Sequence, residues 1–432
     1  MNATLPPARI CMLNYYAWGV FADLDGQGVH IGGEEVQHAQ LARYLARRGC
    51  RVTSLVGDFG QRALEQVDGV AVRKTYALSD GWPGWRFFMP RLTSTWAALR
   101  QADADVYYTS CAGPMVGVLA RFCRRHGRRF VFRVASDADC MPSTLMLGNA
   151  RDRLLYRYGL TRADVVLAQT RRQAELLLEH YGVRAQLAGM FSDLPAGVAG
   201  FDERGADLLW LANLRSMKRP EWFVDIARQV PRLRCHIAGA AHPGEAELYR
   251  RVADAAADLP NLHFHGQVRF GATAALFANA RLFINTSAFE GFPNTYLQAW
   301  AHGVPVIATF DPDGLIAEHG LGMVVDSAVA AGARARALLA SPADWAACSA
   351  RCRAYAHARL APDLVAQPYL AALMPATGSV PGSSSLTEPA SKPVAARDII
   401  PMTVPANARG TTHVPVPVPA PVPGPVPPEV RA

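Results

Sequence analysis

The segment Asn285-Thr-Ser-Ala-Phe-Glu290-Gly-Phe-Pro-Asn-Thr-Tyr-Leu-Gln298-Ala-Trp-Ala-His-Gly303-Val-Pro-Val-Ile-Ala-Thr309 decides how this chain is organised. Its pattern predicts the end of a short strand, an exposed polar loop, and a helix over about 295–302. Gly303 closes that helix, and the apolar run after it begins the next strand. Glu290 is therefore expected beside a helix N-terminus, where unpaired N–H groups and the helix dipole favour anions.

This segment resembles the signature of the family-4 retaining glycosyltransferases, which have the GT-B architecture. Their motif is two glutamates separated by seven residues, followed by a small-residue helix and a Gly-Val-Pro-Val strand. Glu290 occupies the first acidic position and Gln298 the second. The resemblance implies that Glu290 contacts the donor sugar and supports departure of the nucleotide. It also implies that Gln298, although uncharged, hydrogen-bonds the donor ribose.

The residues between these two positions form the loop and helix start that meet the donor in this resemblance. Gly291, Phe292, Asn294 and Thr295 are therefore expected to bind the donor together with Gln298. Thr295 and Gln298 also have the spacing of a capping box, in which the glutamine side chain returns to the first backbone N–H of the helix. Ribose binding and helix capping both stay open for Gln298.

A basic turn follows the strand predicted over 208–211. The resemblance implies that an arginine and a lysine of this turn hold the donor diphosphate. Lys218 matches the lysine position, whereas the usual arginine position falls on Asn213. Arg215 or Arg219 is expected to take that role. A solvated helix start is the alternative, although positive charge there opposes the helix dipole.

Two further loops follow predicted strands in the N-terminal half. Gly32 and Gly33 come between the first strand, over 9–15, and a helix, and paired glycines let backbone N–H groups approach a ligand closely. An ordinary turn is the alternative. Asp137 follows the strand over 130–135 and is expected to contact the acceptor or a sugar. Asp-x-Asp patterns occur four times along the chain and are therefore too unspecific to predict a metal site.

Strands alternate with helices along most of the chain, which predicts an α/β fold with doubly wound parallel sheets. The resemblance implies a GT-B fold, with two Rossmann-like domains facing across a cleft and a disordered Pro-rich C-terminal tail. The expected parts are an N-terminal acceptor domain (1–193), a linker (194–205), a nucleotide-sugar donor domain (206–361), a helix crossing back to the first domain (362–377) and a Pro/Val-rich tail (378–432).

The amino-acid composition indicates which binding partners and which cellular compartment to expect. The net charge of +8 suits anionic partners such as nucleotides, acidic glycans or the surface of an anionic membrane. No stacking-aromatic or helix-turn-helix pattern supports nucleic-acid binding. Eight scattered cysteines, without a Cys-x2-Cys pair, fit a reducing cytosol. The chain lacks a signal-peptide pattern and a long apolar run, so we expect a cytoplasmic protein, peripheral at most on the inner face of a membrane.

The expected function is that of a retaining, metal-independent glycosyltransferase with no cofactor, for which a nucleotide sugar is co-substrate. Glycans or lipid-linked molecules of polysaccharide, lipopolysaccharide or glycolipid assembly are the expected acceptors. Two alternatives stay open at this point. One is another GT-B chemistry, a sugar-nucleotide epimerase or a phosphorylase. The other is a non-catalytic scaffold that acts through its Pro-rich tail.

Overall fold

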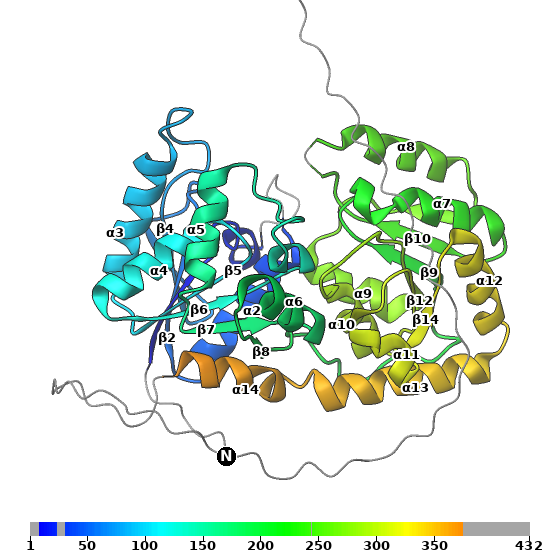
Figure 1. Ribbon diagram of the computed structural model, residues 1–432. Helices are drawn as coiled ribbons and strands as arrows, with labels where there is room; N and C mark the ends of the chain where they lie inside the picture. The colour runs from blue at the N-terminus through cyan, green and yellow to red at the C-terminus, as the bar shows by residue number, and fades with distance from the viewer. Residues whose placement is uncertain (1–7, 24–30, 243, 375–432) are drawn as a thin grey trace, which may run out of the picture. The chain divides into compact units, whose positions relative to one another are not determined.

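The computed structural model describes residues 8–23, 31–242 and 244–374, which fold around two parallel β-sheets (Figure 1). Both sheets lie within one compact unit, Met1–Thr377. The segment expected to be a disordered tail, 378–432, lies outside the described residues. Within the described part of the chain, no helix is long and apolar enough to cross a membrane.

The first sheet has the strand order β3-β4-β2-β1-β5-β6-β7-β8. All neighbouring strands are parallel except β3, which pairs with β4 in the antiparallel sense. Its strands are β1 (Arg9–Leu13), β2 (Arg51–Val56), β3 (Leu64–Val67), β4 (Val70–Lys74), β5 (Val106–Ser110), β6 (Arg129–Arg133), β7 (Val165–Ala168) and β8 (Gln186–Leu187).

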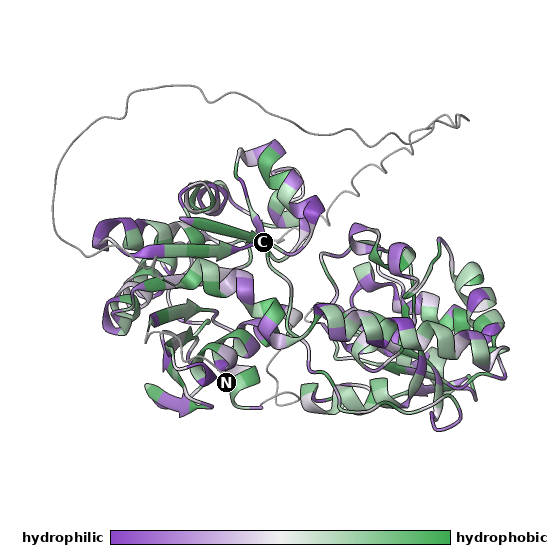
Figure 2. Cartoon of the chain, turned by 90° about the horizontal axis from the view of Figure 1, so that it is seen from below, coloured by the Kyte–Doolittle hydropathy of each residue, from purple (hydrophilic) through white to green (hydrophobic). Residues whose placement is uncertain are grey.

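Helices cover both faces of this sheet because its strands bury side chains in both directions. Along β1, Ile10 and Met12 belong to one apolar cluster, while Cys11 and Leu13 belong to another. This is the two-residue alternation of a strand that is buried on both faces. In Figure 2 the strands are mostly green, with purple segments at some of their ends, whereas the helices carry both colours. The helices are α1 (Trp18–Phe21), α2 (Gly33–Arg47), α3 (Thr93–Ala102), α4 (Pro114–His126), α5 (Ala150–Leu160) and α6 (Arg171–Tyr181).

The second sheet is built in the same way and has the strand order β11-β10-β9-β12-β13-β14. Leu208 and Leu209 of its central strand point into different apolar clusters. The strands are β9 (Ala206–Leu211), β10 (Cys235–Ala238), β11 (Leu262–Phe264), β12 (Ala280–Asn285), β13 (Val306–Ala308) and β14 (Gly322–Val324). The helices are α7 (Pro220–Gln229), α8 (Ala246–Ala257), α9 (Phe270–Asn279), α10 (Asn294–Ala301), α11 (Leu315–His319), α12 (Ala328–Leu339) and α13 (Pro342–Arg359).

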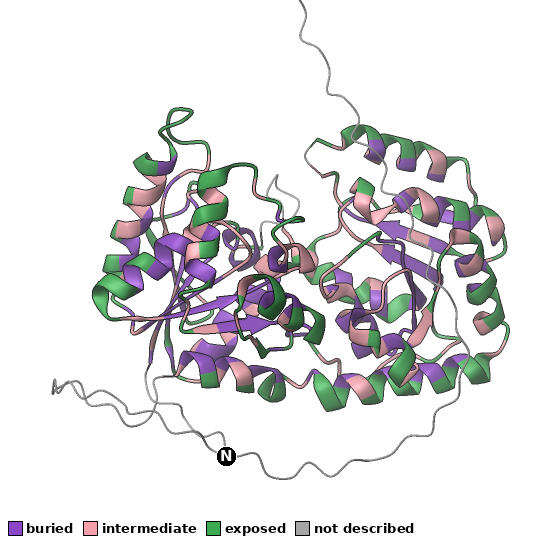
Figure 3. Ribbon diagram, in the orientation of Figure 1, coloured by how far each residue is buried: buried purple, intermediate pink, exposed green. Residues whose placement is uncertain are grey.

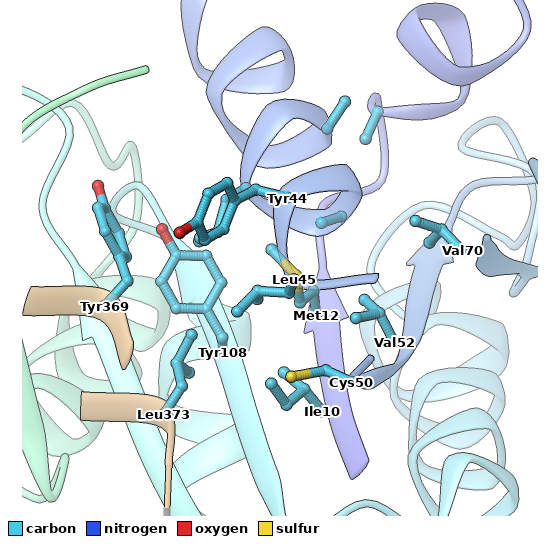
Figure 4. Packing of buried hydrophobic residues seen from close by; sticks show 14 of the residues in the cluster. Ile10, Met12, Tyr44, Leu45, Cys50, Val52, Val70, Tyr108, Tyr369 and Leu373 are labelled. Carbon is cyan, nitrogen blue, oxygen red and sulfur yellow. The ribbon is translucent and has the colours of Figure 1, made fainter. Parts of the chain in front are cut away.

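The last described helix, α14 (Pro362–Leu373), packs on the first sheet although it follows the second in sequence (Figure 1). Figure 4 shows Tyr369 and Leu373 of α14 beside Tyr108 of β5 and Tyr44 of α2. The Tyr44 hydroxyl donates to Asp363 Oδ1 at 2.7 Å. Apolar packing and this hydrogen bond tie the end of the described chain to the first domain.

The segment between the two sheets, 194–205, contains neither helix nor strand, but its end is firmly held. Arg204 is buried, and its guanidinium donates to the carbonyls of Ala199, Ala280 and His302. Burial lowers the pKa of Arg204 to about 10. The residues next to β9 therefore pack as part of the second domain.

The predicted fold class, two Rossmann-like doubly wound domains, is confirmed by the two sheets. The strand predicted over 208–211 ends with β9 at Leu211, and the helix expected from 362 begins there as α14. The edge strands β3 and β8 were not predicted. β3 contains only four residues and two of them are polar, and β8 contains only two residues, so neither has the long apolar run of a central strand.

Candidate active site

A cleft of about 1250 Å³ lies where the carboxyl ends of strands from both sheets meet. In doubly wound folds this end of the sheet is where ligands bind. From the first sheet the loops after β1, β5, β6 and β7 line the cleft, and from the second sheet the loops after β9, β10, β11, β12 and β13 line it. Of the residues predicted for the site, Arg219 alone, the alternative to Arg215, lies outside the lining. The others line the cleft: Gly32, Gly33, Asp137, Arg215, Lys218, Glu290, Gly291, Phe292, Asn294, Thr295 and Gln298.

Glu290 lies in the loop between β12 and α10, and three donors converge on one of its carboxylate oxygens. The hydroxyl of Ser287 donates to Oε1 at 2.6 Å, and Asn285 Nδ2 approaches the same oxygen at 3.5 Å. The Lys218 ammonium completes the set through an ion pair. The carboxylate of this cleft-lining residue is thus fixed through one oxygen, and its other oxygen, Oε2, has no donor among the described residues.

Lys218 reaches Glu290 because its turn is fastened to the exit of β12. The hydroxyl of Thr286 donates to the Lys218 carbonyl at 2.6 Å, and the Ala288 N–H donates to the Met217 carbonyl at 2.8 Å. The lysine itself belongs to a short 3₁₀ helix, Ser216–Lys218. Two loops of the second domain therefore bring an ammonium and a carboxylate together at one point.

The two arginines of this turn have different surroundings. Arg215 lines the cleft, and its Nε is buried with no hydrogen-bond partner among the described residues. Arg219 instead donates to the carbonyls of Thr286 and Ser287, and its guanidinium lies 3.9 Å from the centre of the Trp222 ring. Arg219 is not part of the lining of the cleft. Of the two arginines, Arg215 is the one available to a ligand.

The capping-box interpretation of Thr295 and Gln298 is wrong. α10 begins at Asn294 with Pro293 as its N-cap, one residue earlier than predicted, and has no side-chain cap. Gln298 is then the fifth helical residue, too far along to bond the first N–H. Its Nε2 donates to Thr273 Oγ1 at 3.3 Å, and its side chain lines the cleft.

Asn294 and the glycine pair connect the two domains. Asn294 Nδ2 donates to the Gly33 carbonyl at 2.8 Å, and Gln37 Nε2 donates to Asn294 Oδ1 at 3.2 Å. Gly32 is the N-cap of α2, where its N–H donates to Glu35 Oε2 at 2.9 Å. The Asn294 side chain is thus occupied by the first domain, although it lines the cleft.

Gly291 and Phe292 lie where the backbone of the β12–α10 loop comes close to the first domain. A Cβ at Gly291 would lie 2.7 Å from the Ala135 carbonyl oxygen, a distance that real Cβ atoms do not show. The Phe292 N–H donates to Gln169 Oε1 at 3.3 Å. A side chain larger than hydrogen at Gly291 would therefore push the two walls of the cleft apart.

Comparison with protein families identifies both halves of the chain. Residues 31–188 match the family described as Glycosyltransferase Family 4, and residues 205–343 match the one described as Glycosyl transferases group 1. Together the two matches cover more than half of the chain. The chain belongs to the family-4 glycosyltransferases. A search of curated proteins returned no significant match.

Solved structures similar to this glycosyltransferase have the GT-B architecture, as predicted. Sucrose-phosphate synthase of Thermosynechococcus elongatus has a TM-score of 0.67 at 18% identity, covering 83% of this chain and 96% of its own. HepE of Anabaena, in complex with UDP and glucose, has a TM-score of 0.67 at 15% identity, covering 85% and 99%. WaaG, a glycosyltransferase involved in lipopolysaccharide biosynthesis, has a TM-score of 0.58 at 17% identity, covering 86% and 100%.

The first domain of the glycosyltransferase contributes one acidic residue that the sequence analysis did not single out. Glu34 lines the cleft directly after Gly33, and its carboxylate pairs with Arg133, which is 1% exposed at the end of β6. Glu34 Oε1 is buried and has no hydrogen-bond partner among the described residues. The only local sequence signal for Glu34 was an acidic residue directly after a glycine pair. Its buried partner Arg133 lies 99 residues further along the chain, so the pairing could not be read from neighbouring residues.

Asp137 also lines the cleft of the glycosyltransferase. It follows β6 of the first sheet, whereas the loops proposed to hold the donor belong to the second sheet. Gln173 Nε2 donates to its Oδ1 at 3.2 Å, and Arg172 Nε lies 3.3 Å from its Oδ2. Burial raises the pKa of Asp137 despite these partners. The neighbouring Asp139 accepts hydrogen bonds from the N–H groups of Ala135 and Ser136 and so shapes the loop.

Three histidines gather at neighbouring strands of the second sheet. His263 and His265 both lie against His236 of the adjacent strand, whose Nδ1 is 2.9 Å from His265 Nε2. Burial and the neighbouring histidines lower the pKa of His236 to about 4. Across residues 8–23, 31–242 and 244–374, no group of three or more His, Cys, Asp or Glu side chains is placed to bind a metal ion.

Proposed function

We propose that this glycosyltransferase moves a sugar from a nucleotide diphosphate donor to a hydroxyl acceptor with retention of configuration at the anomeric carbon. The observation that carries the proposal is the meeting of Lys218 and Glu290 in the cleft, beside the start of α10. Donor cleavage leaves positive charge on the sugar and negative charge on the diphosphate. A cation and an anion held side by side match those two charges.

The second domain holds the donor. Lys218 and Arg215 bind the diphosphate, because they are the two basic residues of the β9–α7 turn that line the cleft. Their charge stabilises the leaving group, so the reaction proceeds without a metal ion. Gln298 hydrogen-bonds the ribose, while Gly291, Phe292 and Thr295 surround the donor at the start of α10.

Glu290 acts on the sugar. Its Oε1 is fixed by Ser287, Asn285 and Lys218, so its Oε2 is oriented toward the donor without further ordering. The carboxylate accepts hydrogen bonds from sugar hydroxyls and balances the positive charge of the transition state. The acceptor oxygen attacks from the face that the diphosphate leaves, and its proton passes to the departing phosphate oxygen. Retention then requires no covalent intermediate on the protein.

The first domain holds the acceptor. Glu34 keeps one carboxylate oxygen paired with Arg133 and leaves buried Oε1 for a hydroxyl of the acceptor. Asp137 supplies a second oxygen acceptor on the same wall of the cleft. The acceptor is a glycan or a lipid-linked saccharide of polysaccharide, lipopolysaccharide or glycolipid assembly. Similarity to WaaG, a glycosyltransferase involved in lipopolysaccharide biosynthesis, supports this class. The enzyme is expected in the cytoplasm, at the inner face of the membrane.

A donor screen tests the proposal. The purified chain is incubated with a panel of nucleoside diphosphate sugars, and nucleotide release is measured with and without acceptors. Transfer products are then examined by NMR for the configuration of the new bond. An inverted product contradicts retention, and a changed free sugar without transfer indicates an epimerase. Turnover that depends on phosphate indicates a phosphorylase. Binding of every donor without release of any nucleotide indicates a scaffold.

A further inference from the structure

The segment that leads into α3, a loop followed by the short helix η1 (Phe87–Leu92), carries four large exposed apolar side chains. The exposed fraction is 83% for Trp82, 73% for Trp85, 49% for Phe88 and 69% for Met89. We call these four residues the aromatic tip. The loop lies at the upper left in Figure 3, where it is exposed along most of its length. Four such side chains within eight residues form a cluster of exposed apolar groups, whereas single exposed apolar residues need no explanation.

The aromatic tip is held outward by an ordered backbone. The N–H groups of Trp85 and Arg86 donate to the Trp82 carbonyl, and those of Phe88 and Met89 donate to the Trp85 carbonyl. Gly81 has a φ of +93°, and a Cβ there would lie 2.6 Å from the Arg86 Cβ. The chain therefore fixes these side chains toward solvent instead of letting them collapse onto the domain.

Phe87 is buried and so attaches the aromatic tip to the first domain. It is the buried residue between the exposed ones, and the Arg151 guanidinium lies 4.0 Å from the centre of its ring. Arg151 is in the first turn of α5, and the segment before α5 borders the cleft through Met141, Thr144 and Met146. The aromatic tip and one rim of the cleft are thus joined through α5 (Figure 1).

Positive charge is concentrated in the same part of the sequence. Residues 79–162 contain thirteen arginines and six aspartates, a net charge of +7, whereas the whole chain carries +8. Arg86 is exposed inside the tip, and Arg151 and Arg153 are exposed at the start of α5. The tip and the start of α5 therefore combine aromatic rings with three exposed arginines, of which Arg151 pairs with Asp152.

We propose that the aromatic tip docks the enzyme on the surface of an anionic lipid bilayer. Tryptophan prefers the interface between the headgroups and the hydrocarbon, and arginine is attracted by anionic headgroups. The inference rests on the proposed function in one respect, since it gives the cleft access to a lipid-linked acceptor. Docking through the tip brings the rim formed by Met141, Thr144 and Met146 toward the membrane.

The charge of the chain argues against two other occupants of this surface, a second copy of the chain and its own residues 378–432. A second copy of the chain carries the same net charge of +8 and the same arginine-rich segment, so it repels the tip. Residues 378–432 contain four basic and three acidic residues, so they offer no negative surface to the arginines. An anionic bilayer complements both the aromatic and the cationic groups.

Co-sedimentation with vesicles tests the proposal. The full chain, without sugar nucleotide, is mixed with vesicles of phosphatidylcholine alone or of equal parts phosphatidylcholine and phosphatidylglycerol. The expected result is binding to the anionic vesicles that weakens with salt. The double variant Trp82→Ala/Trp85→Ala is expected to lower the partition coefficient by about tenfold or more, because two large apolar side chains no longer enter the interface. Arg86→Gln is expected to lower it by about fivefold.

Matched controls come from the second domain. Val329→Ala removes an exposed apolar side chain from α12, and Arg232→Gln removes an exposed charge, and both should bind as the parent does. Donor hydrolysis in solution should be unchanged in all four variants, which separates failure of this inference from failure of the proposed function. A parent that does not bind anionic vesicles overturns the proposal, and so does a tip variant that binds as well as the parent. If the parent is a dimer in solution and the tip variant is a monomer, the tip binds a second copy of the chain, and this result would also overturn the proposal.

Discussion

Lys218 and Glu290 form an ion pair across the donor side of the cleft, although 72 residues separate them in the chain. The two side chains are only 19% and 10% exposed, so each charge depends on the other for compensation. The pair also joins the β9–α7 turn to the β12–α10 loop, and those loops carry most of the residues proposed to hold the donor. Catalysis and local order are therefore coupled at this point.

Glu290→Gln is expected to lower kcat by on the order of 10²-fold or more, because the carboxylate charge is needed mainly in the transition state. Gln keeps the shape of the side chain and can still accept from Ser287, so the fold should persist. Steady-state donor turnover and circular dichroism measure the two effects. Glu318→Gln, an exposed acid of α11, is the control and should turn over normally. A folded Glu290→Gln enzyme with near-parental kcat would refute the assignment.

Lys218→Ala is expected to weaken nucleoside diphosphate binding far more than nucleoside binding, because only the diphosphate loses a charged contact. The expected loss is about 1.5–3 kcal/mol, the usual value for a hydrogen bond to a charged group. Calorimetric titration with both ligands measures it. Arg219→Ala is a useful comparison, because Arg219 contacts backbone carbonyls outside the cleft and should affect stability instead. Equal weakening for both ligands in Lys218→Ala would indicate a disturbed loop.

Gln298→Ala distinguishes a donor contact from a structural role. The loss of the hydrogen bond to Thr273 costs about 0.5–1.5 kcal/mol of stability, whereas loss of a ribose contact raises the donor KM. Thr273→Val removes the same internal hydrogen bond and leaves Gln298 facing the cleft. We expect the donor KM to rise in Gln298→Ala, to stay unchanged in Thr273→Val, and to be near-parental in Gln298→Glu. The same KM in both Gln298→Ala and Thr273→Val would assign Gln298 to packing alone.

Local patterns predicted much of the fold and of the donor side of the cleft. The strand–loop–helix run around Glu290 is continuous in sequence, so its elements, its glycine stop and its position at a strand exit follow from neighbouring residues. The error at α10 shows the limit of such reasoning. α10 begins at Asn294, one residue earlier than Thr295 suggested, with Pro293 as its N-cap, and that shift moves Gln298 out of capping distance.

Contacts between distant segments could not be predicted in this way. The Glu34 carboxylate forms an ion pair with Arg133. The Asn294 side chain forms hydrogen bonds with Gly33 and Gln37 of the other domain. The apolar pattern of a strand reports that it is buried, but it does not report which side chain of another strand lies opposite. The aromatic tip was missed for a related reason, because exposure depends on the folded backbone that holds these residues outward.

Buried His38 predicts acid sensitivity of the first domain. Its ring nitrogen Nε2 lies 2.9 Å from Ser54 Oγ, and burial, followed by the nearby Arg133 charge, lowers the pKa of His38 from 6.5 to about 3. Between these values the unfolded chain binds a proton that the folded chain does not. The free energy of unfolding should therefore fall as the pH decreases from 6.5 toward 3. Urea titrations at a series of pH values measure this slope.

His38→Gln should reduce that slope, since it removes the group that takes up the proton on unfolding. His180→Gln, which changes an exposed histidine of α6, is the matched control and should retain the parental slope. The two variants isolate His38 from the carboxylates that also titrate in acid. Parallel slopes for the parent and His38→Gln would mean that His38 is protonated in the folded enzyme.

The acceptor side of the cleft is tested at Glu34. Its pairing with Arg133 means that Glu34→Gln leaves a buried guanidinium without its counter-charge, which costs about 3–5 kcal/mol of stability. Glu34→Asp keeps the charge but withdraws the carboxylate by one methylene group, so it is the more informative variant. Because Oε1 is proposed to accept a hydroxyl of the acceptor, Glu34→Asp should raise the acceptor KM by about tenfold, as expected when a buried charged hydrogen bond is lost. Donor hydrolysis without acceptor should stay at the parental rate, since Lys218 and Glu290 are untouched. A lowered melting temperature with an unchanged acceptor KM would leave Glu34 as the partner of Arg133 only.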